Sequence, residues 1–266
     1  MTDIIHILLY IQTATVILCL LYGSIIDIFK REISDIPWIV MVLEGIVTTI
    51  LMIIFYNDKK EIWRIIGINF SLALIIGIII YYTGIMGGAD AKAIMALSVN
   101  TAIFPFDFPL TKLTVYLFLP PVFNIFFNWL LAIIIFYPIP LAIYNIILKL
   151  RGIKLFNETH ANFFDKILSL ISGYIIKVEK AKNRIDIVYS EVYNQKNERW
   201  EIKHFMKVEE EEEEEKFKHE VEEWINKTNK EYIWVKVLPP GIVFLLIGYV
   251  ISLFIGNPLF ALFSLL

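Results

Sequence analysis

Apolar runs of about 20 residues recur along this 266-residue chain, and the first three cover residues 4–28, 37–56 and 65–86. A bilayer core about 30 Å thick is crossed by roughly 20 apolar residues in a helix. Lipid offers the backbone no hydrogen-bond partners, so such a run must satisfy its own amide groups as a helix. The hydrophobic fraction of 58% also exceeds the roughly 45–50% of soluble domains. We therefore expect a polytopic membrane protein.

Three more apolar runs complete the pattern, at residues 89–105, roughly 117–148 and 237–265. The predicted fold class is an all-α polytopic membrane protein with six transmembrane helices. The fourth run is near the lower limit of about 17 residues for a crossing. The fifth carries four prolines, which predict kinks or a late helix start because proline lacks a backbone donor. The first run lacks a basic leader and a cleavage site, so we expect a retained helix.

A long polar segment, residues 149–236, separates the fifth and sixth runs and holds most of the charged residues. Alternation in Tyr174–Glu179 and Arg184–Tyr189 predicts a small β element, hence a small α+β domain inserted between helices 5 and 6. Glu209–Glu215 predicts a solvated linker or exposed helix, with an acidic patch for a basic partner as the alternative. The predicted division is a five-helix membrane core (1–148), a cytoplasmic polar domain (149–236) and a sixth helix (237–266).

Two aspartates lie where the apolar runs end. Asp27 closes the first run, and Asp90 follows Gly87 and Gly88 just beyond the third. Ionisable groups in or beside spanning helices are costly and mark a site or an ion path. The first and third runs cross the bilayer in the same direction, so both carboxyl groups reach one membrane face. Two carboxyls sharing a proton provide the base and the acid that metal-free amide hydrolysis requires.

No other catalytic pattern competes with this pair. The four histidines are scattered without zinc-site or Ser–His spacing. A lone cysteine, Cys19, forms neither an intramolecular disulfide nor a cysteine-based metal site. We expect no metal, no cofactor and no nucleic acid partner.

Two short motifs surround the aspartates. They read Ser24-x-x-Asp27-x-x-x-Arg31-Glu32-Ile33 and Gly87-Gly88-Ala89-Asp90-x-Lys92. This pattern resembles the prepilin peptidases, which are intramembrane aspartyl proteases of the GxGD type, and within them the archaeal preflagellin peptidases. The polar insertion before a last span introduced by Tyr232-Ile233-Trp234-Val235 is also similar. The third motif position is Ala89 instead of glycine, so we expect Gly87 and Gly88 to supply any unusual turn.

The resemblance implies an aspartic endopeptidase with Asp27 and Asp90 as its catalytic residues. It implies removal of a short basic leader from archaellin (preflagellin) or type IV pilin-like precursors, whose apolar helix lies in the bilayer. The expected location is the cell membrane, multi-pass, with the site at the cytoplasmic face. Lys30 and Arg31 favour that face under the positive-inside rule, although the scheme places the basic residues near residue 60 outside.

Four expectations concern residues around the pair. Ser24, one turn before Asp27, either bonds to the pair or only packs, and with Gly23 it lets the first helix approach the fourth. Lys92 either favours ionised Asp90 or binds a substrate carbonyl, the alternative being a side chain that snorkels to the interface. Arg31, with Glu32 and Asp35, organises the first cytoplasmic turn. Helix dipoles favour an ionised carboxylate at the start of a helix and disfavour it at the end, which assigns the resting proton to Asp27.

Two alternatives belong to other functional classes. One is a transporter or channel in which Asp27, Glu44 and Asp90 form an ion path, and the other is a non-catalytic membrane scaffold. Many transporters are built from internal repeats with paired broken helices, and the chain shows neither. Neither alternative gives the Gly-Gly-Ala-Asp turn a function.

Overall fold

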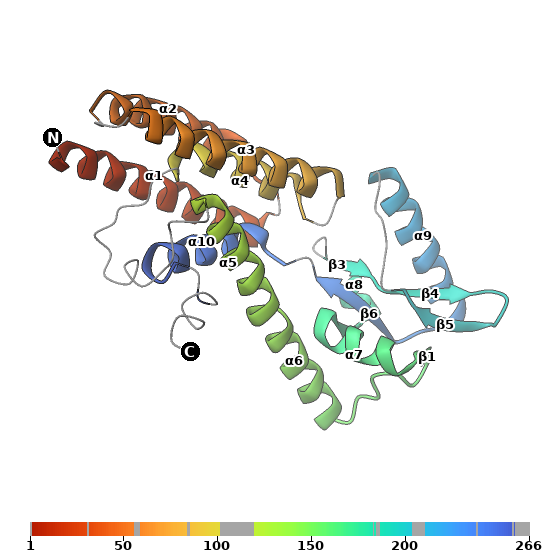
Figure 1. Ribbon diagram of the computed structural model, residues 1–266. Coiled ribbons are helices and arrows are strands. Elements are labelled where there is room, and N and C mark those ends of the chain that lie inside the picture. The colour runs from red at the N-terminus through yellow and green to blue at the C-terminus, as the bar shows by residue number, and fades with distance from the viewer. Residues whose placement is uncertain are drawn as a thin grey trace. The chain divides into compact units, whose positions relative to one another are not determined.

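The structure, a computed structural model, describes residues 2–30, 32–55, 59–83, 86–101, 120–182, 184, 187–203, 211–237, 239–256 and 258. The chain forms two compact units. The first comprises residues 1–132 and 240–266, and we call it the membrane unit. The second comprises residues 133–239, and we call it the sheet unit. Figure 1 shows the helices and strands of each.

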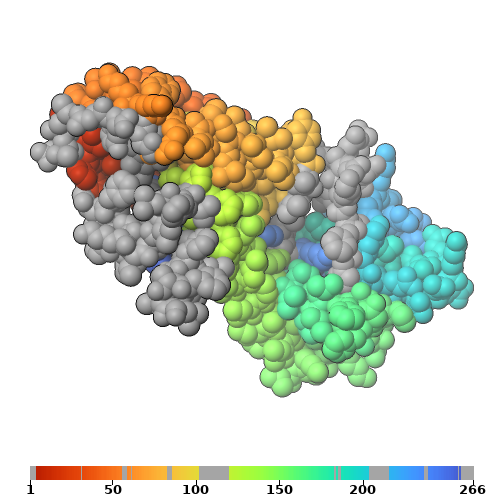
Figure 2. All heavy atoms as spheres, viewed as in Figure 1, coloured from red at the N-terminus to blue at the C-terminus, as the bar shows by residue number. Residues whose placement is uncertain are grey.

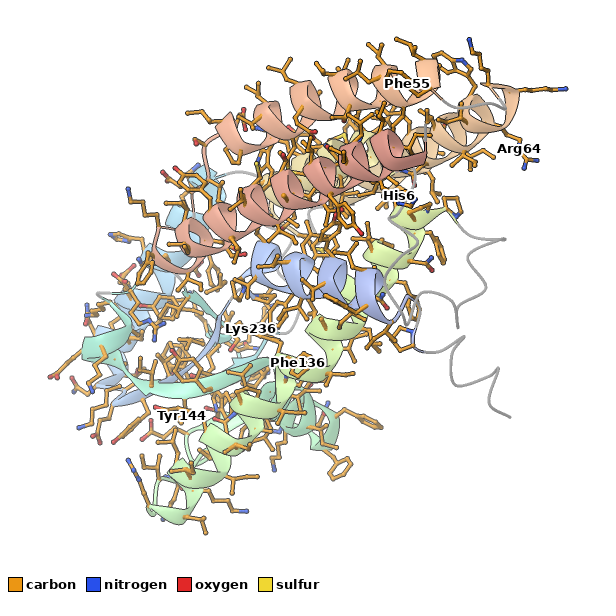
Figure 3. The ribbon with its side chains drawn as sticks, turned by 90° about the vertical axis from the view of Figure 1, so that its left-hand side faces the viewer. His6, Phe55, Arg64, Phe136, Tyr144 and Lys236 are labelled. Atoms are coloured by element: carbon orange, nitrogen blue, oxygen red, sulfur yellow. The ribbon has the colours of Figure 1, made fainter. Side chains whose placement is uncertain are left out.

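The membrane unit is helical. It contains α1 (Thr2–Phe29), α2 (Ile36–Phe55), α3 (Lys59–Thr83), α4 (Gly88–Asn100), most of α5 (Pro121–Phe136) and α10 (Gly241–Phe254). Helix α1 packs against α2 and α10, and α4 packs against α2 and α3. Figure 3 shows His6, Phe55 and Arg64 at one end of the unit, as expected for successive antiparallel helices.

The described residues contain four helical stretches that are long and apolar enough to cross a membrane. They are Ile4–Phe29, Ile36–Phe55, Ile62–Tyr82 and Pro121–Leu150. The prediction of six spans is therefore met only in part. Helix α4 has 13 residues, about 20 Å, against a bilayer core of about 30 Å. It need not match the bilayer, because Ala91, Ala93, Ile94 and Leu97 are buried among other helices.

The predicted sixth span is also shorter than expected within the described residues. Helix α10 has 14 residues and begins at Gly241. The prediction started this helix at Val237, which was wrong, because Val237 ends strand β6. The predicted end near residue 265, and residues 102–119 beyond α4, lie outside the described residues.

Two of the four prolines of the fifth run begin helices, whereas the sequence predicts kinks or a late helix start there. Helix α5 begins at Pro121, and α6 (Pro138–Leu150) begins at Pro138. A proline in the first turn costs little, because the amide it lacks would have no intrahelical partner there. The boundary between the two units falls after Ala132, so α6 belongs to the sheet unit.

The sheet unit contains two three-stranded sheets. In one, β6 (Tyr232–Val237) lies between the antiparallel strands β2 (Gly173–Lys177) and β3 (Ile187–Tyr189). In the other, β5 (Arg199–Ile202) lies between antiparallel β4 (Glu191–Asn194) and parallel β1 (Thr159–His160). The helices are α6, α7 (Phe163–Ser172), α8 (Val178–Ala181) and α9 (Glu211–Thr228). The predicted β element is confirmed, and residues 211–215 of the glutamate run are helical.

A buried ion pair lies in the sheet unit. Lys230 Nζ is 3.1 Å from Glu191 Oε2, and the two side chains are 2% and 0% exposed. The Glu191 carboxylate also accepts hydrogen bonds from the Trp234 amide and the Thr159 hydroxyl, so it links β1, β4 and β6. Burial lowers the pKa of Lys230, and Glu191 opposes that shift.

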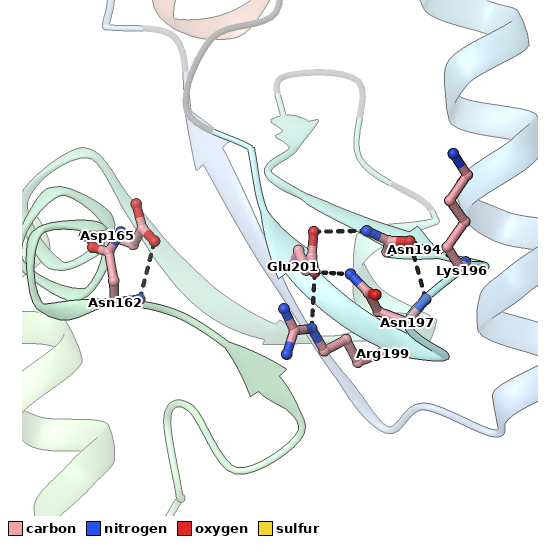
Figure 4. Close-up of polar contacts among 7 residues, drawn as sticks. All are labelled: Asn162, Asp165, Asn194, Lys196, Asn197, Arg199 and Glu201. Atoms are coloured by element: carbon pink, nitrogen blue, oxygen red, sulfur yellow. Dashed lines mark hydrogen bonds and ion pairs between the residues drawn. The ribbon is translucent and has the colours of Figure 1, made fainter.

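The β4–β5 turn is held by a surface carboxylate, shown in Figure 4. Glu201 accepts hydrogen bonds from Asn194, Asn197 and Arg199. These bonds, that from Asn194 foremost, lower the pKa of Glu201 to about 2. One carboxylate of β5 thus connects the end of β4, the turn and the start of β5.

Candidate active site

Asp27 lies near the C-terminal end of α1 and is 8% exposed. Its Oδ2 accepts a hydrogen bond of 3.1 Å from the backbone amide of Ile242, the second residue of α10. The first amides of a helix have no intrahelical partner. Asp27 therefore caps a helix more than 200 residues further along the chain.

Close packing brings α1 to α10. A β-carbon at Gly23 would lie 3.1 Å from side-chain atoms of both Ile242 and Trp38. The sequence predicted that this part of α1 approaches the fourth helix. Helices α1 and α4 do contact each other, but the atoms nearest to Gly23 belong to Ile242 of α10 and to Trp38 of α2.

Asp90 lies in the first turn of α4 and is 8% exposed. Its Oδ2 accepts a hydrogen bond of 3.1 Å from the Gly87 amide, and its own amide donates to the Gly87 carbonyl at 3.0 Å. The bond from the Gly87 amide to the Asp90 side chain is one of the two bonds of a capping box. The other bond of that motif would need a side-chain acceptor at position 87, which glycine lacks. Asp90 is thereby held at the N-terminus of its own helix.

The two glycines before Asp90 do not form an unusual turn. Gly87 has φ −65° and ψ 155°, an extended conformation open to any residue. Gly88 and Ala89 begin the helix, and the positive-φ glycines of the described residues are Gly152 and Gly256. An alanine at the third motif position therefore fits the backbone without strain.

Gly241 brings the two aspartates to one place. A β-carbon on Gly241 would overlap the Oδ1, Oδ2 and Cγ atoms of Asp90. The Asp90 carboxyl group thus lies directly against the first residue of α10, and Asp27 is bonded to the amide of the second. The structure brings both predicted residues to two consecutive positions of the last helix, which the sequence reasoning missed. The signal was Pro239-Pro240-Gly241 before an apolar run.

The helix dipoles around the pair differ from the sequence expectation. That expectation considered only the helix that carries each aspartate. Asp27 lies at the end of α1 but also at the start of α10, so the dipoles of these two helices act on it in opposite directions. Each carboxylate therefore faces a helix N-terminus, and the assignment of the proton to Asp27 stays a prediction.

The other residues predicted for the site do not share one environment. Ser24 is buried, and its hydroxyl has no hydrogen-bond partner among the described residues. The exposed Lys92 ammonium lies 2.7 Å from Asp35 Oδ1 and links α4 to the residue before α2. Arg31 lies outside the described residues. Both carboxyl oxygens of Glu44 are buried without a hydrogen-bond partner in the described part of the chain.

No group of three or more His, Cys, Asp or Glu side chains among the described residues is placed to hold a metal ion. At the site itself, the described residues place two buried carboxyl groups beside two backbone amides.

Residues 14–139 match the type IV leader peptidase family, and residues 165–257 match the C-terminal region of archaeal peptidase A24, type II. The chain belongs to the type IV leader peptidase family. Over 252 residues it is 26% identical to a preflagellin peptidase of Methanocaldococcus jannaschii, covering 92% of this chain and 93% of that protein. It is a membrane peptidase that processes leader peptides, and the transporter interpretation is not supported.

The two family matches contribute different parts of this leader peptidase's candidate site. The first contains Asp27 and Asp90, and the second contains Gly241 and Ile242. The carboxyl groups and the helix start against which they lie thus come from opposite ends of the chain.

Proposed function

We propose that this leader peptidase is an aspartic endopeptidase of the GxGD type with Asp27 and Asp90 as its catalytic pair. The observation that supports this most is that both carboxyl groups lie against Gly241 and Ile242. In the proposed reaction one carboxylate accepts a proton from the attacking water. The other carboxyl protonates the carbonyl oxygen or the leaving amine.

The backbone amides give each carboxyl group a defined orientation. Gly87 holds Asp90, and Ile242 holds Asp27, each through a bond of 3.1 Å. Positioning of this kind lowers the barrier, because the reacting groups need not be ordered during the reaction. Ser24, Arg31 and Lys92 stay predicted supporting residues.

We further propose that the substrates are archaellin or type IV pilin-like precursors, cut at the cytoplasmic face of the cell membrane. The relative's name, preflagellin peptidase, supports the substrate class. Lys30, the residue directly after α1, supports the cytoplasmic face under the positive-inside rule. The precursor's apolar helix then lies in the bilayer beside the membrane unit.

Asparagine variants test the pair directly. In Asp27→Asn and Asp90→Asn the amide oxygen still accepts the backbone hydrogen bond, but proton transfer is lost. We expect cleavage of a precursor peptide by the purified protein to fall by about 10²–10⁴-fold, with unchanged thermal stability. Normal turnover by either variant would refute the mechanism.

Asp165→Asn is the matched control. Asp165 occupies the same third position of a helix, α7, and accepts a hydrogen bond of 3.0 Å from the Asn162 amide. We expect this variant to cleave like the wild type. Activity that is lost in a chelator and restored by added metal would instead overturn the metal-free assignment.

A further inference from the structure

Helix α7 has its apolar face turned outward. Five side chains form this stripe, with 71%, 73%, 42%, 42% and 38% of their surface exposed: Phe163, Phe164, Ile167, Leu168 and Ile171. Their spacing places them on one side of the helix. The inward side includes Ser169, which is 3% exposed. A helix in water normally packs its apolar stripe inward, so this face requires an apolar covering.

Hydrogen bonds at both ends of α7 fix this orientation. Buried Asn145 of α6 donates to the Leu170 carbonyl at 3.0 Å and to the Gly173 carbonyl at 2.8 Å. At the other end Asn162 and Asp165 cap the helix reciprocally, a contact drawn in Figure 4. The outward stripe is thus a property of a well-anchored helix.

The stripe continues onto α6. Helix α6 exposes its own apolar residues, at 54%, 52%, 55%, 41% and 81% for Ile139, Ile143, Ile146, Ile147 and Leu150. It belongs to the candidate span Pro121–Leu150, in which an 18-residue apolar stretch has only 11% of its residues buried. Figures 1 and 3 show α7 beside α6, and their atoms (green) adjoin in Figure 2. An apolar covering of the span's outer surface therefore extends over α7.

Charge on the same stretch suits a membrane surface. Lys149, Arg151 and Lys154 are exposed just after α6, and Lys166 is exposed on α7. The acidic residues nearby in sequence are Glu158 and Asp165. This excess of positive charge favours anionic headgroups beside the apolar stripe.

We propose that α7 is an interfacial helix that lies on the bilayer and inserts Phe163 and Phe164 among the lipid chains. An amphipathic helix with aromatic side chains on its apolar face and lysines at its margin binds in this way. The sheet unit is then held to the lipid surface by α7 in addition to α6.

Spin labels on the full chain in nanodiscs test the proposal. The discs contain phosphatidylcholine and phosphatidylglycerol, and the background variant Cys19→Ala removes the single cysteine. A nitroxide at Phe164→Cys should be accessible to oxygen and protected from a water-soluble nickel reagent. The control label at Lys196→Cys, in the exposed β4–β5 turn, should show the reverse.

Two outcomes would overturn the proposal. A Phe164 label that nickel reaches as readily as the Lys196 label would place α7 in water. A label protected from both reagents would assign the stripe to a protein partner. The same measurement at Ile167→Cys, one turn further on, repeats the test if the first label perturbs the helix, and precursor cleavage checks that each labelled protein is folded.

Discussion

The two units of this peptidase stabilise their buried polar groups in different ways. In the membrane unit, neutral side chains bond between helices, as Gln12 does to Thr48 and Asn128 to Ser252. In the sheet unit, full charges pair at Lys230 and Glu191. Asp27 and Asp90 of the membrane unit instead accept hydrogen bonds from backbone amides at helix starts. Partial charges fixed by the backbone thus help to hold these two acidic groups in place in an apolar unit.

The largest effect is expected from a substitution at Gly241, where the backbone of the membrane unit meets a buried carboxyl group. In Gly241→Ala the added methyl group would overlap the Asp90 carboxyl group and displace it. A misplacement of about 1 Å costs about 100-fold in rate, so we expect kcat/KM for precursor cleavage to fall at least that far. The control is Gly67→Ala, since a β-carbon there meets nothing within 4 Å. Full activity of Gly241→Ala would show that this close contact is dispensable.

The second test removes the cation of the sheet unit. Lys230→Met leaves the Glu191 carboxylate buried without its cation, which should destabilise this unit by about 3–5 kcal/mol. Adding Glu191→Gln should restore much of the loss, because the neutral amide still accepts the Trp234 amide bond. Hydrogen exchange of the amides in β4, β5 and β6 measures the effect. If Lys230→Met alone were neutral, the ion pair would not carry the stability assigned to it.

The smallest expected effect belongs to the neutral bonds of the membrane unit. Asn128 is fully buried, and its amide donates to Ser252 Oγ at 2.8 Å and to the Gly256 carbonyl at 2.5 Å. Interhelix bonds of this type contribute about 0.6 kcal/mol on average, so Asn128→Ala should destabilise the protein by about 1 kcal/mol in detergent unfolding. Exposed Asn157→Ala should change little. A loss as large as that of Lys230→Met would erase the contrast between the units.

The sequence was sufficient to predict the aspartate pair and the apolar helices, because both depend on local patterns. It was insufficient where distant segments meet. Asp27 and Ile242 are 215 residues apart, and the hydrophobic periodicity of the sequence does not predict their hydrogen bond. The sequence alone predicts a span from Val237, which ends strand β6, because apolar residues lie on both sides of Pro239 and Pro240.

The short fourth helix illustrates a different limit. Its residues were counted as a span by hydrophobicity, whereas its buried alanines reflect contact with α2 and α3. Apolar composition alone does not distinguish a helix covered by protein from one covered by lipid. Conversely, the outward stripe of α7 was not recognised, because a run of ten helical residues inside a charged segment is too short to suggest a membrane.

The capping role of the two aspartates has a practical consequence for anyone who re-engineers this enzyme. Each carboxyl group is a catalytic group in the proposed mechanism, and in the structure it also accepts a hydrogen bond from a backbone amide at the start of a helix. An alanine at either position removes both functions, so the inactivity of such a variant says nothing about chemistry. Only replacements that keep an acceptor oxygen can remove proton transfer and still accept the hydrogen bond from the backbone amide.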